Sequence, residues 1–414
     1  MYHPQSQSCP VCNTEVPSRF LKQSGVPTNC SALYATAAAA QSVPRGDIEL
    51  AFCSNCGMIF NAAFEREQVT YDVSYENSLR FSPTFCEYAD SLATRLVEAH
   101  GLKGKRIVEV GCGDGEFLRT ICRKGGNSGA GFDPSFAGVL DDPNIAIIRN
   151  SYDDSAADTP ADFVCCRHVL EHIQQPRNLL LQVHRALSGR AGSAAYFEVP
   201  DAIAVLSGTA IWDVIYPHCN YFTAVSLAGL FEACHFTVHN ITMSFGQQYL
   251  AIEASPRTDS TPLRPSYRSL DIQKLSRVVE RFRLHFRETV EQWARFLEYA
   301  HAEGRRVVLW GAGAKAVTFL NTIPGASRVA SVVDMNPRKQ GSFVPGTGHQ
   351  VIAPAALAST QPDILITLNP VYEGEIRRIA ASMGLTAEVI TKPGIPILPA
   401  RPVRHLNAMA QKMH

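Results

Sequence analysis

Residues 106–115 read Arg-Ile-Val-Glu-Val-Gly-Cys-Gly-Asp-Gly and decide the fold class. The apolar residues Ile107, Val108 and Val110 form a short run that is typical of a buried parallel strand. The run ends in three glycines at alternate positions, Gly111, Gly113 and Gly115. Helix-forming residues 116–119 follow at once, and glycine lets a backbone approach a ligand closely because it has no Cβ and tolerates positive φ. The stretch therefore predicts a strand–turn–helix unit of an α/β sheet with a ligand-binding turn.

The spacing Glu109-x-Gly-x-Gly-x-Gly differs from the Gly-x-Gly-x-x-Gly of dinucleotide-binding proteins. It resembles motif I of the class I S-adenosylmethionine (SAM) methyltransferases, in which this turn holds the methionine part of the cofactor. Residues 130–133, Ala-Gly-Phe-Asp, read as the end of the next strand, where Asp133 can bind ribose hydroxyls. A tight turn without a ligand is the alternative, and the second acidic residue disfavours it. The resemblance implies an α/β, Rossmann-like core whose cofactor-binding residues include Glu109, Gly111, Gly113, Gly115 and Asp133.

The composition excludes several classes of partner. The chain has 414 residues, which corresponds to two or three domains, and its 38 basic and 38 acidic residues give a formal charge of zero. A nucleic-acid-binding protein needs a basic surface, so we expect no nucleic-acid partner. No apolar run approaches the roughly 20 residues of a membrane helix, so we expect no membrane partner. Twelve cysteines without a secretory signal suit reduced thiols in a cytoplasm.

Four of these cysteines form two Cys-x-x-Cys pairs, Cys9-Pro-Val-Cys12 and Cys53-Ser-Asn-Cys56. This spacing lets two thiolates bind one tetrahedral Zn²⁺, so two pairs predict a closed structural Zn²⁺ site. Cys30 is an alternative ligand, and a redox pair or unliganded thiols are the alternatives to a metal. The segment has few basic residues, which argues against a nucleic-acid-binding zinc ribbon.

A second polar motif follows the strand predicted at residues 162–166. It reads Arg167-His168-Val-Leu-Glu171-His172, and residues just past the carboxyl end of such a strand face the ligand crevice of an open α/β sheet. His168, Glu171 and His172 are therefore candidates for cofactor or substrate contact. The motif resembles the one after the same strand in many SAM methyltransferases, which implies cofactor contacts from Arg167 and His168. The order is not His-Glu-x-x-His, so we predict no metal here.

The rest of the chain supplies a loop, a long helix and a second nucleotide-like unit. Residues 71–78 mix aromatic and polar groups and read as an ordered loop. From Leu270 onward, apolar residues three or four apart predict a long amphipathic helix. Trp310-Gly311-Ala-Gly313 then forms another strand–turn–helix signature, with Asp334 where a ribose-binding carboxylate would stand. We divide the chain into a zinc-binding domain (1–68), a methyltransferase domain (69–256), a linker with the long helix (257–298) and a C-terminal Rossmann-like substrate domain (299–414).

Taken together, these features are similar to the three-domain C-methyltransferases of deoxysugar biosynthesis, which methylate nucleotide-linked 4-keto sugars. The resemblance implies that Tyr75 and His218 match the catalytic tyrosine and histidine of that family. The family's glutamate is replaced by Pro217, and its Gly-Gly-Ser-Leu-Arg segment by Gly-Gln-Gln-Tyr-Leu at residues 246–250. Both departures indicate a divergent subgroup, which either has an altered acceptor or uses His218 alone.

We therefore expect SAM-dependent methylation of a carbon next to the carbonyl of a small, nucleotide-linked keto compound. His218 is the expected base, with a pKa near 6.5, and Tyr75 or Asn220 is expected to hydrogen-bond the enolate oxygen. If His218 is not the base, Tyr75, Glu171 or His168 takes that role. The alternatives are O- or N-methylation of a small natural-product intermediate, and a nucleotide-binding protein whose C-terminal unit binds NAD. We expect no redox cofactor there; the sequence leaves the acceptor, the methylated atom and the oligomeric state open.

Overall fold

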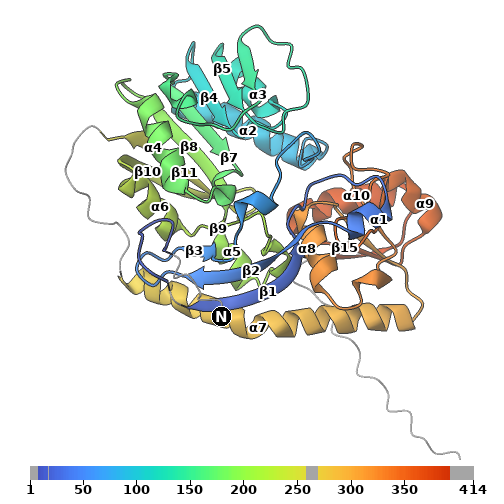
Figure 1. Cartoon of the computed structure of the whole chain (residues 1–414). Helices are drawn as coiled ribbons and strands as arrows, with labels where there is room; N and C mark the ends of the chain where they lie inside the picture. Colours follow the sequence, from blue (N-terminus) through green and yellow to red (C-terminus); the bar gives the residue numbers. More distant parts are fainter. Residues whose placement is uncertain (1–7, 17, 258–268, 392–414) are drawn as a thin grey trace, which may run out of the picture.

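The computed structural model describes residues 8–16, 18–257 and 269–391, and Figure 1 shows their arrangement around three sheets. The first sheet is antiparallel and carries the N-terminal lobe. Its strand order is β1 (Arg19–Pro27), β2 (Arg45–Phe52), β3 (Ile59–Asn61) and β9 (Asn220–Tyr221). Since β9 lies within the methyltransferase part of the chain, this lobe and the methyltransferase domain share a sheet. The short helix α1 (Ala37–Gln41) lies between β1 and β2 in sequence.

The second sheet has seven strands in the order β10-β11-β8-β7-β4-β5-β6. Strand β11 alone runs antiparallel to its neighbours, and the remaining pairings are parallel. This sheet confirms the predicted class I methyltransferase core. Its strands are β4 (Arg106–Val110), β5 (Ser128–Phe132), β6 (Ile145–Ile148), β7 (Phe163–Arg167), β8 (Ala194–Pro200), β10 (Phe236–Ser244) and β11 (Tyr249–Pro256), and the helices of this part of the chain are α2 (Pro83–Ala99), α3 (Glu116–Gly125), α4 (Pro176–Leu187), α5 (Ala202–Ser207) and α6 (Ala224–Ala233).

The order of this sheet places the predicted ligand-binding turn. Strand β4 pairs with β5 on one side and with β7 on the other, so the strand order reverses beside β4. Ligands of open α/β sheets bind in the crevice outside the carboxyl ends of the strands at such a switch point. The glycine turn after β4, Asp133 after β5 and the polar motif after β7 therefore meet at one edge.

The third sheet is wholly parallel and confirms the expected Rossmann-like C-terminal domain. Its order is β14 (Val351–Ile352), β13 (Ser331–Val333), β12 (Val307–Trp310), β15 (Ile364–Thr367) and β16 (Glu388–Thr391). The helices of this domain are α8 (Ala314–Thr322), α9 (Leu357–Thr360) and α10 (Glu373–Ser382).

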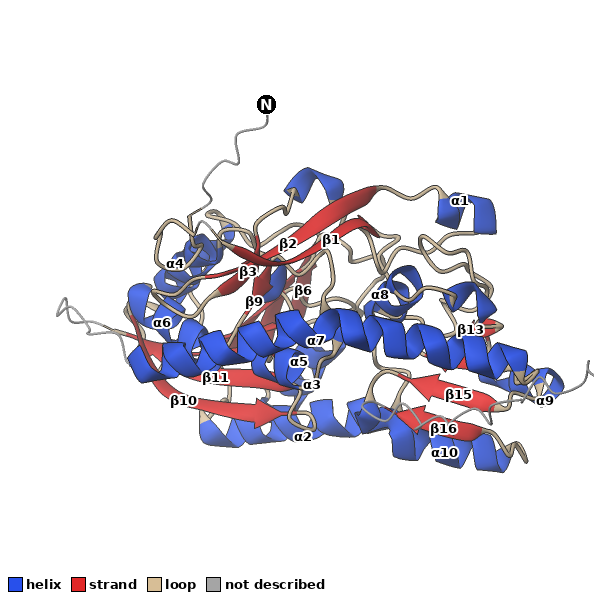
Figure 2. Ribbon diagram, turned by 90° about the horizontal axis from the view of Figure 1, so that it is seen from below, coloured by secondary structure: helices blue, strands red, loops and turns tan. Residues whose placement is uncertain are grey.

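The long amphipathic helix predicted from Leu270 onward is α7 (Ser269–Ala302). It runs beneath both the N-terminal sheet and the C-terminal domain (Figures 1 and 2). Its apolar face joins the segment after α5 to the C-terminal domain, because the ring centroid of buried Trp293 lies 6.0 Å from that of Trp212 and 5.0 Å from that of Phe319. Residues 258–268, within the expected linker, lie outside the described residues.

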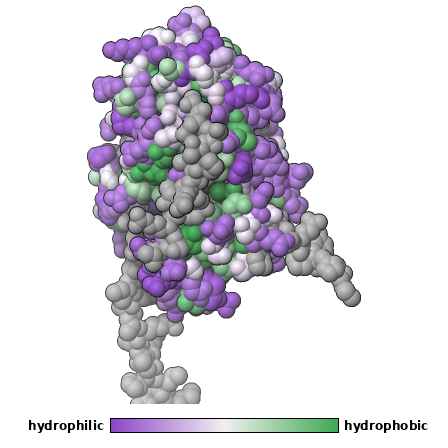
Figure 3. Space-filling view, turned by 90° about the vertical axis from the view of Figure 1, so that its left-hand side faces the viewer, coloured by the Kyte–Doolittle hydropathy of each residue, from purple (hydrophilic) through white to green (hydrophobic). Residues whose placement is uncertain are grey.

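Among the described residues, no helix combines the length and the apolar character needed to cross a bilayer. On the face seen in Figure 3, hydrophilic residues dominate the coloured atoms, and the apolar ones form small separate areas.

Candidate active site

The glycine turn after β4 has the left-handed backbone that its sequence predicts. Gly111, Gly113 and Gly115 have φ values of 69°, 54° and 78°, in the left-handed region that disfavours side chains. A Cβ on Gly111 would lie 2.1 Å from Val169 Cγ2, whereas a Cβ on Gly113 would meet no atom within 4 Å. Gly111 is thus required for packing against the segment after β7. Gly113 leaves open space beside the backbone, where a ligand can approach.

Asp133 ties this turn to the next strand. Its Oδ2 accepts a hydrogen bond from Gly113 N at 2.8 Å, and its Oδ1 accepts from Ser135 N and Oγ at 2.8 and 2.6 Å. Because a carboxylate oxygen can accept two hydrogen bonds, Oδ2 can still receive one ribose hydroxyl, and a second can bind Oδ1 if it takes the place of Ser135 Oγ. Asp133 therefore stands where the sequence predicts a ribose-binding carboxylate.

Glu109 is a buried acid with an unused oxygen. Its side chain is 3% exposed, and Glu109 Oε2 has no hydrogen-bond partner among the described residues. Burial raises the pKa of Glu109 to about 8. An orphaned buried acceptor is costly, so it is suited to a ligand that brings a donor. The open turn, Asp133 and this unused oxygen together fit the amino acid and ribose parts of SAM.

These groups line one cavity of about 860 Å³, a volume within the range of small-molecule sites. The cavity reaches from the glycine turn to a group of rings and polar side chains after β7 and before α2. Its walls include Tyr71, Tyr75, Gly113, Asp133, Arg167, His168, His172 and Tyr249. The structure thus brings cofactor-binding and candidate catalytic residues into the same space. His218 is not among the lining residues and lies behind His172.

Arg167 and His168 are organised by a carboxylate that the sequence did not single out. Glu198, fully buried at the end of β8, lies 3.3 Å from Arg167 Nε and 3.0 Å from His168 Nε2. Burial alone would raise the pKa of Glu198, but Arg167 and the neighbouring hydrogen-bond donors hold it well below its usual range. Those donors include Tyr88 Oη, Tyr196 Oη and Ser244 Oγ. His168 also has a left-handed backbone, with φ 58°, a strain often found at functional sites.

A second group of side chains surrounds His172. Its Nδ1 lies 2.9 Å from the carbonyl oxygen of Pro217 and 3.0 Å from Tyr71 Oη. A carbonyl can only accept, so Nδ1 carries the proton and Nε2 is left as the basic nitrogen. The His172 and His218 rings are 4.8 Å apart. Pro217, which replaces the family's glutamate, therefore acts through its backbone oxygen.

Burial keeps both imidazoles neutral. It lowers the pKa of His172 to about 4 and that of His218 well below 6.5, and the neighbouring His172 lowers the latter further. The expectation that the His218 pKa lies near 6.5 is therefore wrong, because an enclosed imidazole loses the hydration that stabilises its charged form. Neutral imidazoles are the form that can accept a proton.

Glu171 lies beside the histidines as a buried acid. It is 2% exposed, its Oε2 has no hydrogen-bond partner among the described residues, and burial raises its pKa to about 8. Glu171, His172 and His218 offer ligand-type atoms that all lie within 4.8 Å of one another. This grouping could hold a metal ion, although the order of the residues in sequence did not indicate one.

The two candidate partners of an enolate oxygen differ in their surroundings. Tyr75 lines the cavity, its ring lies 5.2 Å from that of Tyr71, and burial raises its pKa to about 12, so its hydroxyl stays protonated. Asn220 Nδ2 instead donates to the carbonyl oxygens of Ile173 and Leu170, at 2.7 and 3.4 Å. Asn220 therefore orients the turn that carries Glu171 and His172, and its expected role as an enolate donor is wrong.

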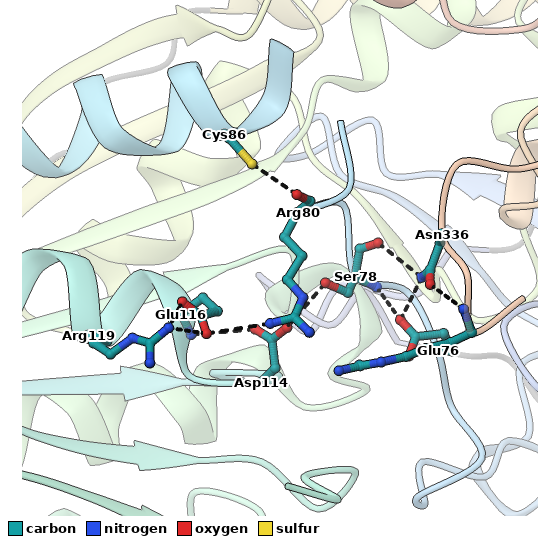
Figure 4. A network of polar contacts seen from close by, with 9 residues as sticks. Glu76, Ser78, Arg80, Cys86, Asp114, Glu116, Arg119 and Asn336 are labelled. Carbon is teal, nitrogen blue, oxygen red and sulfur yellow. Dashed lines mark hydrogen bonds and ion pairs between the residues drawn. The ribbon is translucent and has the colours of Figure 1, made fainter. Parts of the chain in front are cut away.

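A segment before α2 crosses the cofactor side of the cavity (Figure 4). Ser78 Oγ donates to Asp114 Oδ2 at 3.2 Å, and Arg80 Nε lies 3.3 Å from the same oxygen. At the other end, Glu76 Oε1 accepts from Asn336 Nδ2 of the C-terminal domain at 2.9 Å. Residues 76–80 therefore connect the glycine turn to the third sheet. Nothing in the local sequence of this loop predicts such a connection.

The four predicted zinc ligands come together at the edge of the N-terminal lobe. The Sγ atoms of Cys9 and Cys56 lie 3.5 Å apart, as do those of Cys12 and Cys53, and all four lie within 4.8 Å of one another. A tetrahedral Zn²⁺ with Zn–S bonds of about 2.3 Å has S–S edges of about 3.8 Å, so the four thiols fit it. Cys30 is outside this group and contacts the carbonyl oxygen of Pro27 at 3.8 Å.

Comparison with known proteins adds two family matches. Residues 81–241 match the family described as methyltransferase domain, and residues 266–390 match the C-methyltransferase C-terminal domain. The C-methyltransferase NovU of Streptomyces niveus is 24% identical over 316 residues, which cover 70% of this chain and 72% of that protein. The mitochondrial ubiquinone biosynthesis O-methyltransferase of Schizosaccharomyces pombe is 30% identical over 101 residues, or 21% of this chain and 35% of that protein.

Solved structures that resemble this chain cover a smaller share of it. A SAM-dependent methyltransferase from Mesorhizobium loti is 17% identical with a TM-score of 0.33, covering 40% of this chain and 97% of that one. Magnesium protoporphyrin IX methyltransferase from Synechocystis, solved with bound S-adenosylhomocysteine, is 18% identical with a TM-score of 0.33, covering 42% and 84%.

Proposed function

For this chain, which is a SAM-dependent methyltransferase with a C-terminal domain of the C-methyltransferase type, we propose methylation of a carbon next to the carbonyl of a small keto compound. A nucleotide-linked keto sugar is the acceptor class that the family resemblance favours. The observation that carries the proposal is the pair of neutral, partly buried imidazoles beside the cavity: His172 lines it, and the His218 ring lies behind, 4.8 Å from the His172 ring. Carbon is a nucleophile only after it loses a proton, so C-methylation needs such a base, whereas SAM itself supplies only the methyl group.

We assign separate residues to cofactor binding, proton abstraction and enolate stabilisation. Glu109 and Asp133 hold the cofactor, so that the methyl group and the acceptor carbon meet in line. His218 removes the α-proton of an acceptor that reaches past His172, the ring that lines the cavity and that the Pro217 carbonyl holds in place. The protonated hydroxyl of Tyr75 donates a hydrogen bond to the oxygen of the enolate as its charge develops. Glu171 and His168 are the alternative proton acceptors if His218 does not take part.

Hydrogen exchange tests the carbon acid step without requiring methyl transfer. The protein, saturated with S-adenosylhomocysteine, is incubated in D₂O with a panel of nucleotide-linked keto sugars and simple keto acids, and deuterium at the α-carbon is followed by NMR. The wild type should exchange this proton, and His218→Ala should lower exchange and turnover by roughly 10²–10⁴-fold. Affinity for SAM should stay within about twofold, because His218 does not line the cofactor half. The matched control is His239→Ala, an exposed histidine of β10.

Each other outcome points to a different assignment. Exchange that persists in His218→Ala moves the base to Tyr75, Glu171 or His168. Absence of exchange with every acceptor, together with methyl transfer to a hydroxyl or amine, supports O- or N-methylation, the alternative that Pro217 favours because the residue before His218 in sequence cannot ionise. A second equivalent of bound metal that disappears in His218→Ala would show that Glu171, His172 and His218 hold an ion, and His218 could then not be the free base.

A further inference from the structure

Four arginines line the cavity, and three of them face carboxylates. Arg80 Nε lies 3.3 Å from Asp114 Oδ2, Arg119 is paired with Glu116, and Arg167 Nε lies 3.3 Å from Glu198 Oε1. The fourth is Arg66, in the 3₁₀ turn Arg66–Gln68. Among the described residues it has no ion-pair partner, and its one hydrogen bond runs from Nη1 to the carbonyl oxygen of Val69.

The charges of the cavity are segregated along its length. Three lining carboxylates lie at the glycine turn, the start of α3 and the end of β5, which is the half that fits the cationic cofactor: Asp114, Glu116 and Asp133. Glu109 beside them is a buried acid whose pKa is raised to about 8, and Asp90 of α2, which also lines the cavity, pairs with Lys124 Nζ at 2.8 Å. The lining residues near Arg66 are Tyr71, Tyr75 and His172, and all three are uncharged at neutral pH. Arg66 therefore supplies the unbalanced charge of the acceptor half. Complementarity of charge favours a ligand with a negative group there.

The guanidinium is also held in place. Its Nη1 donates to Val69 O at 2.6 Å, and its central carbon lies 5.3 Å from the centroid of the Tyr71 ring. The hydroxyl of that ring lies 3.0 Å from His172 Nδ1, so Arg66 stands on the histidine side of the cavity. Its Nε and Nη2 have no acceptor among the described residues. A positioned arginine with unused N–H groups suits a phosphate or a carboxylate, which it can bind through two parallel hydrogen bonds.

We propose that Arg66 binds an anionic group of the methyl acceptor, and that the acceptor is therefore a phosphate ester, a nucleoside diphosphate derivative or a carboxylic acid. This inference rests on the proposed function, because it assigns a substrate class to the same cavity. It makes Arg66 a residue for specificity and positioning: the anion is anchored on one side of Tyr71 while the keto group faces the histidines on the other. Since Arg66 is on the exposed rim, the interaction should weaken as salt rises.

Equilibrium binding of simple probes tests the proposal. Full-length protein saturated with S-adenosylhomocysteine is titrated with uridine 5′-diphosphate, succinate and uridine by calorimetry. The wild type should bind at least one of the two anions and bind uridine more weakly. Arg66→Gln should weaken anion binding roughly 10- to 100-fold, the range for hydrogen bonds to charged groups, and Arg66→Lys should restore part of it. The matched control is Arg295→Gln, an exposed arginine of α7, which should bind like the wild type.

The titrations distinguish the chemical class of the anion, and together with the exchange experiment they distinguish failure of the Arg66 site from failure of C-methylation. Preference for uridine 5′-diphosphate indicates a nucleotide-linked acceptor, and preference for succinate indicates a keto acid. Binding of neither anion to the wild type, or equal binding to Arg66→Gln, overturns the proposal. If Arg66-dependent binding is found but no acceptor exchanges its α-proton, the anion site stands and C-methylation fails. If exchange occurs and Arg66→Gln leaves the KM of the acceptor unchanged, C-methylation stands and the anion site fails.

Discussion

His172 and His218 show how burial sets the chemistry of a single residue. In water an imidazole is half protonated near pH 6.5, but burial lowers the pKa of both residues, and that of His172 to about 4. The neutral base is therefore retained as the pH falls through 6.5 and is lost only when the pH passes the lower folded-state pKa.

This gives a prediction for the pH dependence of catalysis. The acid limb of kcat/KM, which reports the essential groups of the free enzyme, should lie below about pH 6. Steady-state rates at fixed ionic strength check it. Glu171→Gln is the control, because the pKa of Glu171 is about 8 and any limb in that region should vanish in this variant. A limb centred near 6.5 that survives in Glu171→Gln would contradict the effect of burial on the base.

Asp133 gives a prediction for cofactor binding. Asp133→Ala removes the ribose acceptor and the hydrogen bonds from Gly113 N and Ser135, so SAM affinity should fall by roughly one to two orders of magnitude. Asp133→Asn keeps one acceptor oxygen and should fall less. Calorimetric titration with SAM measures both. Equal affinity of Asp133→Ala and the wild type would show that Asp133 does not hold the ribose.

At the scale of residues, sequence reasoning works where a function follows directly from local pattern. Asp133 and the three glycines stand at strand ends that hydrophobic periodicity already marks. Tyr71 and Glu198 were not predicted, since their roles depend on partners far away in sequence: His172 lies 101 residues from Tyr71, and Arg167 lies 31 residues from Glu198. Asn220 was misread for the same reason: its amide is used by the backbone of a distant turn, which no local pattern reveals.

At the scale of elements, the two cysteine pairs of the N-terminal lobe pack into its hydrophobic core and present four thiols to one point. Cys53→Ser should lower zinc content from about one equivalent to a small fraction and lower the melting temperature as well, because metal binding and folding are linked. Metal analysis and thermal unfolding of the same samples check it. Cys30→Ala, at a thiol outside the cluster, should keep its metal. Full zinc in Cys53→Ser, or its loss in Cys30→Ala, would show that the ligand set is different.

The C-terminal strand–turn–helix unit resembles a dinucleotide site by sequence but differs in its contents. Asp334 Oδ2 accepts from Ala312 N at 2.7 Å, as Asp133 does from Gly113 N, but Lys339 Nζ lies 3.9 Å from the same oxygen. Lys339 is 6% exposed, so a buried cation stands beside the carboxylate that would bind ribose.

We therefore predict that this unit does not bind NADH or NADPH. Fluorescence titration of the full chain with each dinucleotide should give no saturable signal at concentrations up to about 100 times the micromolar range typical of cofactor sites. Lys339→Ala should be the variant in which weak binding first becomes measurable. Stoichiometric binding of either dinucleotide to the wild type would contradict this prediction, and it would also contradict the proposal that SAM is the organic cofactor of the enzyme by itself.

Some elements are fully determined by local sequence and others are not. The start of α6 follows from local sequence, because threonine is a favoured N-cap residue and Thr223 Oγ1 accepts from Ser226 N at 3.2 Å. Strand β9, three residues earlier, has only two residues and pairs with β3 from the N-terminal lobe. Its existence depends on that distant partner, and a two-residue strand carries no periodicity to be read.

Across the whole molecule, the segment before α2 connects the cofactor cavity to the C-terminal domain. Glu76 is 9% exposed; its Oε1 accepts from Asn336 Nδ2 and Ser78 N, and its Oε2 lies 3.0 Å from Arg338 Nη1. Beyond Ser78, Arg80 reaches the carboxylates at the start of α3 (Figure 4). The position of the C-terminal domain is thereby linked to the wall of the SAM site.

The last prediction tests this link. Glu76→Gln removes the charge that faces Arg338 and places an amide N–H₂ group against it or against Asn336, so residues 76–80 should loosen. SAM affinity should fall about three- to tenfold, in line with the loss of one charge-assisted hydrogen bond that is partly open to water. Amide hydrogen exchange should rise both in residues 76–80 and around Asn336, on two different domains. Glu373→Gln, which breaks an exposed ion pair within α10, is the matched control and should change neither quantity. If SAM affinity falls while exchange around Asn336 stays as in the wild type, Glu76 acts only on its own loop, and the C-terminal domain is not coupled to the cofactor site through it.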